Sequence, residues 1–272
     1  MVGSEDRRFR FGSNWLDFSE LIDDGRIAEA ELSLQRLCGT DRLDGLRFLD
    51  IGSGSGLSSL AARRLGARVF SFDYDENSVA CTARLRDGQR PGDDGWCVDR
   101  GSILDATYVA SLGEFDIVYS WGVLHHTGAM GEALKQASRL VAPGGLLSFA
   151  LYRKTFLCAA WRYEKRWYAG ASTGAQARAR SLFLSAMRLA FGVTRKDFKS
   201  YVANYRSNRG MSFEHDVHDW LGGYPYESIT PAEVAAFMVP IGLEHVRSFT
   251  QPSSIGLLGS GCDEYVYQKS LA

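Results

Sequence analysis

The segment that most constrains the fold is residues 47–56, RFLDIGSGSG, where an apolar run ends and three glycines follow at alternate positions. This pattern predicts a buried strand that leads into a ligand-binding loop. Gly52, Gly54 and Gly56 can adopt positive φ and admit a ligand where a Cβ would collide. Apolar residues at helical spacing follow, with Ser58 as the expected cap. A helix N-terminus at this loop favours an anionic ligand group.

Glycine spacing and a second strand indicate which cofactor the loop binds. A dinucleotide fingerprint has the spacing G-x-G-x-x-G, whereas Leu57 occupies the final position here. A nicotinamide cofactor is therefore disfavoured. The next apolar segment, ARVFSFDYD, contains Asp73, which lies about 20 residues after Gly52. A carboxylate at the end of this strand would accept hydrogen bonds from both ribose hydroxyls, so we expect Asp73 to bind a ribose.

Four segments resemble, in this order, class I S-adenosylmethionine-dependent methyltransferases: LDIGSGSG, FSFDYD, FDIVYSWGVLHH and LVAPGGLLSFALY. The resemblance covers roughly residues 45–152 and, more loosely, 230–269. It implies S-adenosylmethionine as the cofactor. One departure is Gly101-Ser102-Ile103, where many members carry an Asp that meets the adenine amino group. The cofactor-binding residues expected on this basis are Asp50, Gly52, Ser53, Gly54, Gly56, Asp73, Tyr74, Ser102, Ile103 and Trp121.

Alternating apolar and amphipathic segments predict an α/β fold with a doubly wound, mostly parallel sheet. The resemblance implies seven strands, a Rossmann-like methyltransferase core and a helical cap inserted between strands 5 and 6. We expect the strands and helices of the first half to include strands 47–51, 67–73, 95–100 and 115–120 and helices 25–38 and 130–141. The expected divisions are an N-terminal helical lid (1–44), a cofactor-binding core (45–152), a basic cap (153–229) and a C-terminal helix and strand hairpin (230–272).

Three boundary features refine this organisation. Pro143 and the two glycines after it should end the 130–141 helix and start the fifth strand. Thr230 should cap a helix that begins at Pro231. Trp15 and Phe18 are candidates to fold over the cofactor as a lid, with plain core packing as the alternative.

Charge is strongly polarised along the chain. Residues 153–209 carry thirteen Lys and Arg against Glu164 and Asp197, a net charge of +11, whereas the whole chain carries −1. This contrast predicts an anionic small-molecule acceptor or carrier. The alternative is a solvated cap whose charges face the acidic core or its copy in a homo-oligomer. Nucleic acid is disfavoured because no RNA-binding signature accompanies the block, and peripheral membrane contact is also disfavoured.

Two adjacent histidines, His125 and His126, follow the fourth strand at the sheet edge where open α/β folds bind ligands. An imidazole titrates near neutral pH and suits proton removal from a hydroxyl. In quinone O-methyltransferases that resemble this chain, a Glu-His pair here helps bind a metal, whereas some sugar O-methyltransferases carry His-His and use a His as base. We therefore expect metal-free base catalysis by His125 or His126, with loop packing as the alternative role for one of them.

A second polar group spans residues 211–227, MSFEHDVHDWLGGYPYE. From it we expect four acceptor-binding residues: His215, His218, Tyr224 and Tyr226. The function predicted is methyl transfer from S-adenosylmethionine to an oxygen of a sugar, phenol or carboxylate. N- or C-methylation and a catalytically silent cofactor-binding scaffold remain the alternatives. The N-terminus resembles no signal peptide and no apolar run approaches ~20 residues, so we expect a cytoplasmic protein.

Overall fold

The sheet explains how the glycine loop and the histidines come together. A computed structural model describes residues 9, 11, 22–209, 213–252 and 254–271, without the side chains of 204, 206–209, 214 and 215. Its seven-stranded sheet has the order β3-β2-β1-β4-β5-β7-β6. The first five strands are parallel, and β7 runs antiparallel to both β5 and β6. The expected α/β class and terminal hairpin are confirmed. The strands are β1 Arg47–Ile51, β2 Arg68–Asp73, β3 Trp96–Arg100, β4 Phe115–Trp121, β5 Val141–Tyr152, β6 Leu243–Phe249 and β7 Cys262–Lys269.

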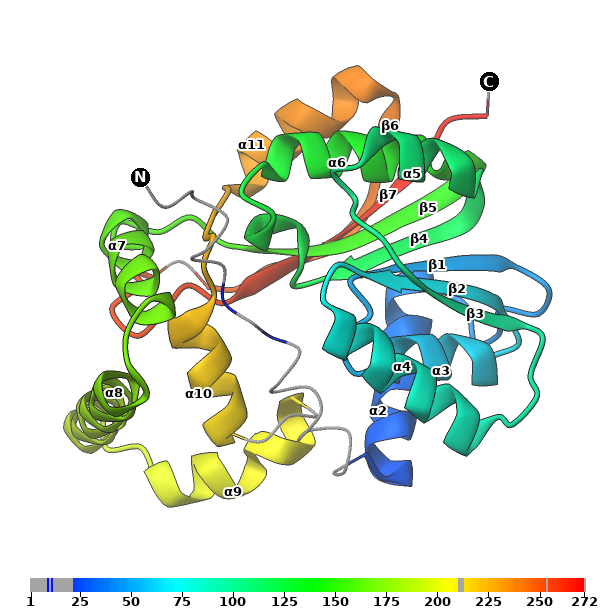
Figure 1. Cartoon of the computed structure of the whole chain (residues 1–272). Helices are drawn as coiled ribbons and strands as arrows, with labels where there is room; N and C mark the ends of the chain where they lie inside the picture. The colour runs from blue at the N-terminus through cyan, green and yellow to red at the C-terminus, as the bar shows by residue number, and fades with distance from the viewer. Residues whose placement is uncertain (1–8, 10, 12–21, 210–212, 253, 272) are drawn as a thin grey trace.

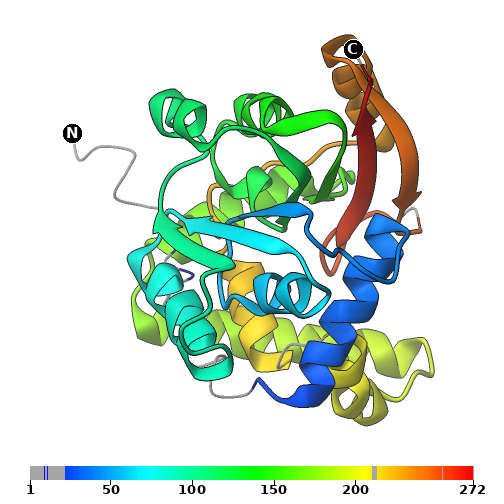
Figure 2. The same ribbon diagram turned by 90° about the vertical axis from the view of Figure 1, so that its right-hand side faces the viewer.

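Helices cover both faces of the sheet, as Figures 1 and 2 show. Along β1, Phe48 packs into one apolar cluster and Leu49 into the other, so this strand is buried on both faces. The helices on the Phe48 face are α2 Asp24–Cys38, α3 Leu57–Arg64 and α4 Glu76–Gln89. Those on the Leu49 face are α5 Ala106–Leu112, α6 Met130–Arg139 and α11 Pro231–Met238.

Four further helices form the inserted cap beyond one end of the sheet (Figure 1). They are α7 Cys158–Ala169, α8 Thr173–Val193, α9 Phe198–Arg209 and α10 Phe213–Gly222. A separate apolar cluster holds α7 and α10 together through Tyr168, Val217 and Leu221. The cap reaches the core at Tyr152, the last residue of β5, whose ring packs edge-on against Trp220 of α10. The cap therefore closes over the carboxyl ends of the parallel strands.

Two boundaries differ from the prediction. Helix α6 ends at Arg139, and β5 begins at Val141, so Pro143 and its glycines lie within the strand and not before it. The reason is that Val141 already pairs with Phe115 of β4, and the register then shifts. Helix α3 begins at Leu57 with Gly56 as its N-cap and no side-chain capping bond, so the prediction that Ser58 caps it is wrong.

Other sequence-based boundaries agree with the structure. Thr230 caps α11, and its hydroxyl and Glu233 form a reciprocal capping box. Trp15 and Phe18 lie outside the described residues. Within the described part of the chain, no helix is both long and apolar enough to cross a membrane.

Candidate active site

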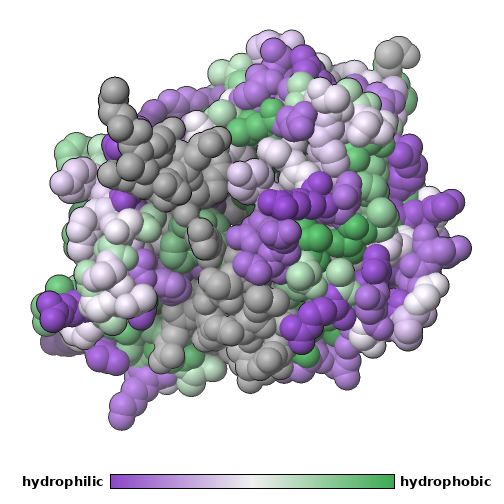
Figure 3. Space-filling view, in the orientation of Figure 1, coloured by the Kyte–Doolittle hydropathy of each residue, from purple (hydrophilic) through white to green (hydrophobic). Residues whose placement is uncertain are grey.

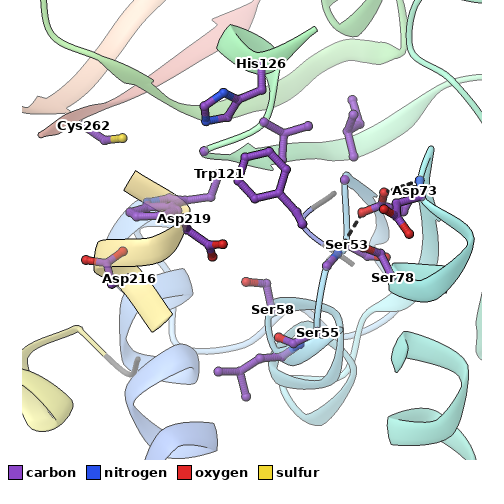
Figure 4. Close-up of a pocket in the computed structure, with 18 of the residues that line it drawn as sticks. Ser53, Ser55, Ser58, Asp73, Ser78, Trp121, His126, Asp216, Asp219 and Cys262 are labelled. Carbon is purple, nitrogen blue, oxygen red and sulfur yellow. Dashed lines mark hydrogen bonds between the residues drawn. The ribbon is translucent and has the colours of Figure 1, made fainter. Parts of the chain in front are cut away.

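A cavity of about 1700 Å³ lies between the strand ends of the core and the cap (Figure 4). The glycine loop after β1 and the end of β2 line one part of it. The turn after β4 and helix α10 line another. Because all these segments follow carboxyl ends of parallel strands or cover them, the cavity occupies the edge at which open α/β folds bind ligands.

The glycine loop has the backbone geometry that its sequence predicts. Gly52, Gly54 and Gly56 have φ values of 75°, 54° and 81°, in the left-handed region. A Cβ on Gly52 would lie 2.5 Å from both γ-carbons of Val123 in the turn after β4. Glycine is therefore required here both for conformation and for the close approach of the two loops. Gly52 and Gly54 line the cavity, whereas Gly56, where a Cβ would lie 3.0 Å from Thr82 of α4, does not.

Asp73 supports this loop from the end of β2. Its carboxylate accepts hydrogen bonds from the backbone N–H of Gly54 at 3.0 Å and of Asp75 at 2.9 Å. Burial raises the pKa of Asp73 to about 6, although these hydrogen bonds act in the opposite direction. A carboxylate has about four acceptor positions, so lone pairs remain for two ribose hydroxyls.

A second buried carboxylate, Asp50, lies at the base of the loop. It accepts a hydrogen bond from Ser59 of α3. Burial raises the pKa of Asp50 to about 7, and the charge of Asp73 adds to that shift. Asp50 therefore ties the end of β1 to the first turn of α3, while Asp73 presents its carboxylate beside the loop.

The remaining predicted cofactor residues also line the cavity, but some of their polar atoms are occupied. Ser53 Oγ lies 2.9 Å from the hydroxyl of Thr82, and Ser102 Oγ accepts from the N–H of Leu104 at 3.2 Å. Trp121 Nε1 donates to Glu264 at 2.9 Å. Tyr74 is exposed at the rim, and Ile103 is buried.

The lining fits S-adenosylmethionine in its polar groups and in charge. The glycine loop lies beside the carboxylate of Asp73, which has acceptor positions for ribose hydroxyls. Nine acidic and three basic side chains line the cavity, which suits a cationic sulfonium group. The acidic set is Glu29, Asp50, Asp73, Asp75, Glu76, Asp105, Asp216, Asp219 and Glu264, and the basic set is Arg26, Arg36 and Arg100.

The two histidines occupy different environments. His126 lines the cavity, and its Nδ1 lies 2.7 Å from the carbonyl oxygen of Pro225. A carbonyl can only accept, so Nδ1 carries the proton and the lone pair of the neutral ring is on Nε2. His125 is fully buried, and its ring packs 4.0 Å from that of Tyr152. Burial holds the pKa of His125 well below its usual value, so this side chain stays neutral in the core.

Gly223 makes room for the His126 ring. A Cβ at this position would lie 2.6 Å from His126 Cε1 and 3.1 Å from the carbonyl oxygen of Asp219. The Gly-Gly pair at 222–223 is visible in the sequence, but nothing local shows that it faces the histidine. Only the packing of the cap against the turn after β4 reveals this role.

The predicted acceptor residues divide into three groups. Tyr224 lines the cavity. His218 does not, because its Nδ1 lies 2.8 Å from the hydroxyl of Tyr168 inside the cap. Tyr226 is buried behind the wall, where its hydroxyl lies 3.3 Å from Cys158 Sγ. The side chain of His215 lies outside the described residues. Neither His218 nor Tyr226 is placed where an acceptor in the cavity would touch it.

The cap wall is aromatic and acidic. Sequence reasoning did not assign the residues that form it, namely Tyr152, Phe183, Tyr201, Tyr205, Phe213, Asp216, Asp219 and Trp220. Figure 4 shows Asp216 and Asp219 on α10, on the far side of the cavity from the glycine loop. A repeated aromatic spacing over 201–213 was the available signal, but it is also typical of a packing face.

The basic residues of the insert do not line this cavity wherever the structure describes their side chains. The expectation that they receive an anionic acceptor therefore lacks a structural basis. Two of them reach the core: Arg153 pairs with buried Asp263 at 2.7 Å, and Lys154 pairs with Glu233 at 2.8 Å. Most of the others are exposed on the outside of the cap.

Comparisons with known proteins identify the core. Residues 49–149 match the family model described as a methyltransferase domain. A ubiquinone biosynthesis O-methyltransferase of Caulobacter sp. (strain K31) is 33% identical over 117 residues, which are 43% of this chain and 45% of that protein. The corresponding protein of Rhizobium rhizogenes (strain K84) is 34% identical over 119 residues, 43% of this chain and 46% of that protein. The matched segment thus spans less than half the length of these relatives.

Solved structures show the same fold over most of the chain. Magnesium protoporphyrin IX methyltransferase from Synechocystis PCC 6803 with bound S-adenosylhomocysteine superposes with a TM-score of 0.54. The match is 14% identical and covers 90% of this chain and 84% of that one. The Burkholderia thailandensis 1,6-didemethyltoxoflavin-N1-methyltransferase has a TM-score of 0.51 at 17% identity, covering 91% and 80%. These matches identify residues 49–149 as a class I S-adenosylmethionine-dependent methyltransferase domain, the family whose members use S-adenosylmethionine as the methyl donor.

Proposed function

We propose that this chain transfers a methyl group from S-adenosylmethionine to a hydroxyl oxygen of a small aromatic molecule. The observation that carries the proposal is His126, which lines the cavity between the glycine loop and the aromatic cap wall with its lone pair on Nε2. The ubiquinone O-methyltransferase relatives act, by name, on oxygen and support this choice.

When bound, S-adenosylmethionine supplies an electrophilic methyl group attached to a good leaving group. Asp73 would hold the ribose, and the bare backbone of Gly52 would let the cofactor lie close to the loop. The protein's main tasks are then to align the acceptor and to remove its proton. His126 Nε2 is the group we assign to that proton. The Pro225 carbonyl that accepts from Nδ1 would stabilise the imidazolium formed.

The cap wall supports an aromatic, uncharged acceptor. Tyr152, Phe213 and Trp220 offer ring faces and edges, which pack well against an aromatic ring. Asp216 and Asp219 face the same part of the cavity and would repel an anionic acceptor. These two carboxylates also favour one second candidate, N-methylation of a cationic amine, over methylation of a carboxylate.

Transfer of labelled methyl groups from S-adenosylmethionine to a panel of phenols, catechols and aromatic amines tests the proposal. We expect turnover on a phenolic acceptor to fall by about 10²–10⁴-fold in His126→Gln. The matched control is His125→Gln, which changes a histidine outside the cavity. Both variants should bind S-adenosylhomocysteine with native affinity.

Three results would contradict this assignment. Native turnover in His126→Gln would show that His126 is not the base. Methylation of amines alone would show that the acceptor atom is nitrogen and not oxygen. Loss of activity on chelation, restored by a divalent metal, would replace base catalysis by metal-assisted catalysis.

A further inference from the structure

Helix α8 of the cap is apolar on more than one face. Its inner face includes Phe183 and Met187, which line the cavity. Its outer face carries Leu182, Leu189 and Val193, which are 73%, 70% and 76% exposed. The intervals of seven and four residues place these three side chains in one row along the helix. An amphipathic surface helix has a polar outer face, so this outer row requires a partner of its own.

Helix α7 adds two exposed aromatic side chains to this apolar surface. Its Trp167 is 50% exposed and its Tyr163 is 79% exposed. A shallow groove of about 570 Å³ lies between the two helices and is lined by Trp167, Leu182 and Ala186, among others. In Figure 3, hydrophobic and hydrophilic surfaces adjoin over the lower left of the molecule, the region of α8 and α9 in Figure 1. The outer surface is therefore an apolar strip and not a single exposed residue.

The charge around this strip is mostly positive. Residues 164–197 contain seven Lys and Arg against two acidic residues, Glu164, which lines the groove, and Asp197. Arg166, Arg178 and Arg188 are exposed on α7 and α8, and Arg195 and Lys196 are exposed just after α8. Arginine can lay its aliphatic stem on an apolar surface while its charge remains in water. The surface thus combines aliphatic side chains, an exposed Trp and Tyr, and cations.

We propose that the outer face of α7 and α8 docks on an anionic lipid surface. Leu182, Leu189 and Val193 would enter the boundary between headgroups and acyl chains, as the apolar face of an interfacial helix does. Trp167 and Tyr163 suit the headgroup level because their rings are amphipathic. The surrounding arginines would attract anionic headgroups. Leu182, Leu189 and Val193 do not line the cavity, so the proposal stands independently of the acceptor.

The charge of the outer face favours an anionic lipid surface over a second copy of the chain as its partner. A symmetric contact would bring the same cationic strip against itself, because the outer face of one copy meets that of the other. Glu164 at the groove and Asp197 after α8 are acidic, but they are outnumbered by the exposed cations Arg166, Arg178, Arg188, Arg195 and Lys196. An anionic bilayer complements the strip in both its apolar area and its charge.

Co-sedimentation of the whole chain with vesicles tests the proposal. The vesicles contain phosphatidylcholine with or without about 30% phosphatidylglycerol. We expect binding to the anionic vesicles, weaker binding to the neutral ones, and loss of binding as salt rises. The Leu182→Gln/Leu189→Gln and Arg166→Glu/Arg178→Glu variants should each bind at least about tenfold more weakly.

Matched controls change comparable exposed residues elsewhere. Leu32→Gln/Val239→Gln replaces side chains that are 65% and 66% exposed, and Arg68→Glu/Arg84→Glu reverses exposed charges on the core. The control variants should bind vesicles as the native chain does. Thermal unfolding and S-adenosylhomocysteine binding verify that every variant is folded.

Trp167→Phe gives a second readout. We expect the native chain to show a blue shift of tryptophan emission on anionic vesicles, and this variant to lose most of it. Equal binding to neutral and anionic vesicles, no binding at all, or equal losses in the test and control variants would overturn the proposal. So would a dimer in solution that Leu182→Gln/Leu189→Gln dissociates, because the strip would then be a subunit interface.

Discussion

Replacement of Asp73 by asparagine tests the ribose site through the pH dependence of cofactor binding. Burial raises the pKa of this carboxyl from 3.8 to about 6. A group with a pKa of about 6 is almost fully ionised at about pH 7.5, and roughly one molecule in eleven is ionised at about pH 5. The affinity for S-adenosylhomocysteine should therefore fall about tenfold over this range, which corresponds to about 1.4 kcal/mol.

The Asp73→Asn variant should lack this pH dependence. Its amide has one acceptor oxygen where the carboxylate has two, so one of the bonds from Gly54 and Asp75 and one ribose contact are lost. We expect a loss of affinity of about 1–3 kcal/mol at neutral pH. Titration calorimetry from about pH 5 to about pH 7.5 measures both effects.

Asp50 provides the control, because the pKa of this carboxyl is also raised, to about 7. Asp50→Asn keeps an oxygen to accept from Ser59. The affinity of this variant for S-adenosylhomocysteine should still fall as the pH is lowered, because Asp73 is unchanged. A flat native affinity over this pH range, or an Asp73→Asn variant that retains the native slope, would refute the reasoning.

The raised pKa of Asp73 also makes the stability of the folded protein depend on pH. The folded protein binds the Asp73 proton more tightly than the unfolded chain does. The free energy of unfolding contributed by this group therefore rises as pH falls from about 6 towards 3.8. Thermal unfolding at each pH separates this contribution from cofactor affinity.

Three further predictions concern the base, the loop and the cap of α11. His126→Gln should lower turnover about 10²–10⁴-fold and leave S-adenosylhomocysteine affinity unchanged, and equal losses in His125→Gln would contradict its role as base. Gly52→Ala should weaken cofactor binding and stability because its Cβ would overlap Val123, and Gly52→Ala/Val123→Ala should recover part of both in calorimetry. Thr230→Ala should lower the free energy of unfolding by about 1 kcal/mol in denaturant titrations, and an unchanged midpoint would show that the capping box contributes nothing.

The positions of the first strands were predictable because the signals are local. The apolar run at 47–51 is bounded by glycines, and its residues are buried on both faces, as a central parallel strand requires. The position of Asp73 beside the glycine loop could be predicted, because its distance from the loop and its place at a strand end are both visible in the sequence. Thr230 and Pro231 likewise form a local signature of a helix start.

The sequence did not predict which of the two histidines is buried and which faces the cavity. Residues Leu124–His126 form a single 3₁₀ turn. With three residues per turn, adjacent side chains point about 120° apart, so His125 enters the core and His126 faces the cavity. The sequence shows the pair but not the surroundings of each ring, which include distant residues: His126 Nδ1 lies against the carbonyl oxygen of Pro225, 99 residues away.

The sequence could not show where the basic residues of the insert lie, for a similar reason. A count of charge over 153–209 does not say which side of a helix the charges occupy. On α8 the apolar residues occupy more than one face, and the exposed Arg178 and Arg188 point away from the cavity that Phe183 and Met187 line. The cap side of the cavity instead includes α10, where Asp216 and Asp219 have the opposite charge.

A crystal structure of the chain with S-adenosylhomocysteine tests the central claim most directly. We expect the ribose hydroxyls to donate hydrogen bonds to the carboxylate of Asp73. We also expect the thioether sulfur to face the part of the cavity that holds His126. A sulfur directed away from His126, with its methyl-transfer path closed by the protein, or a nucleoside bound elsewhere than at Asp73, would contradict the account.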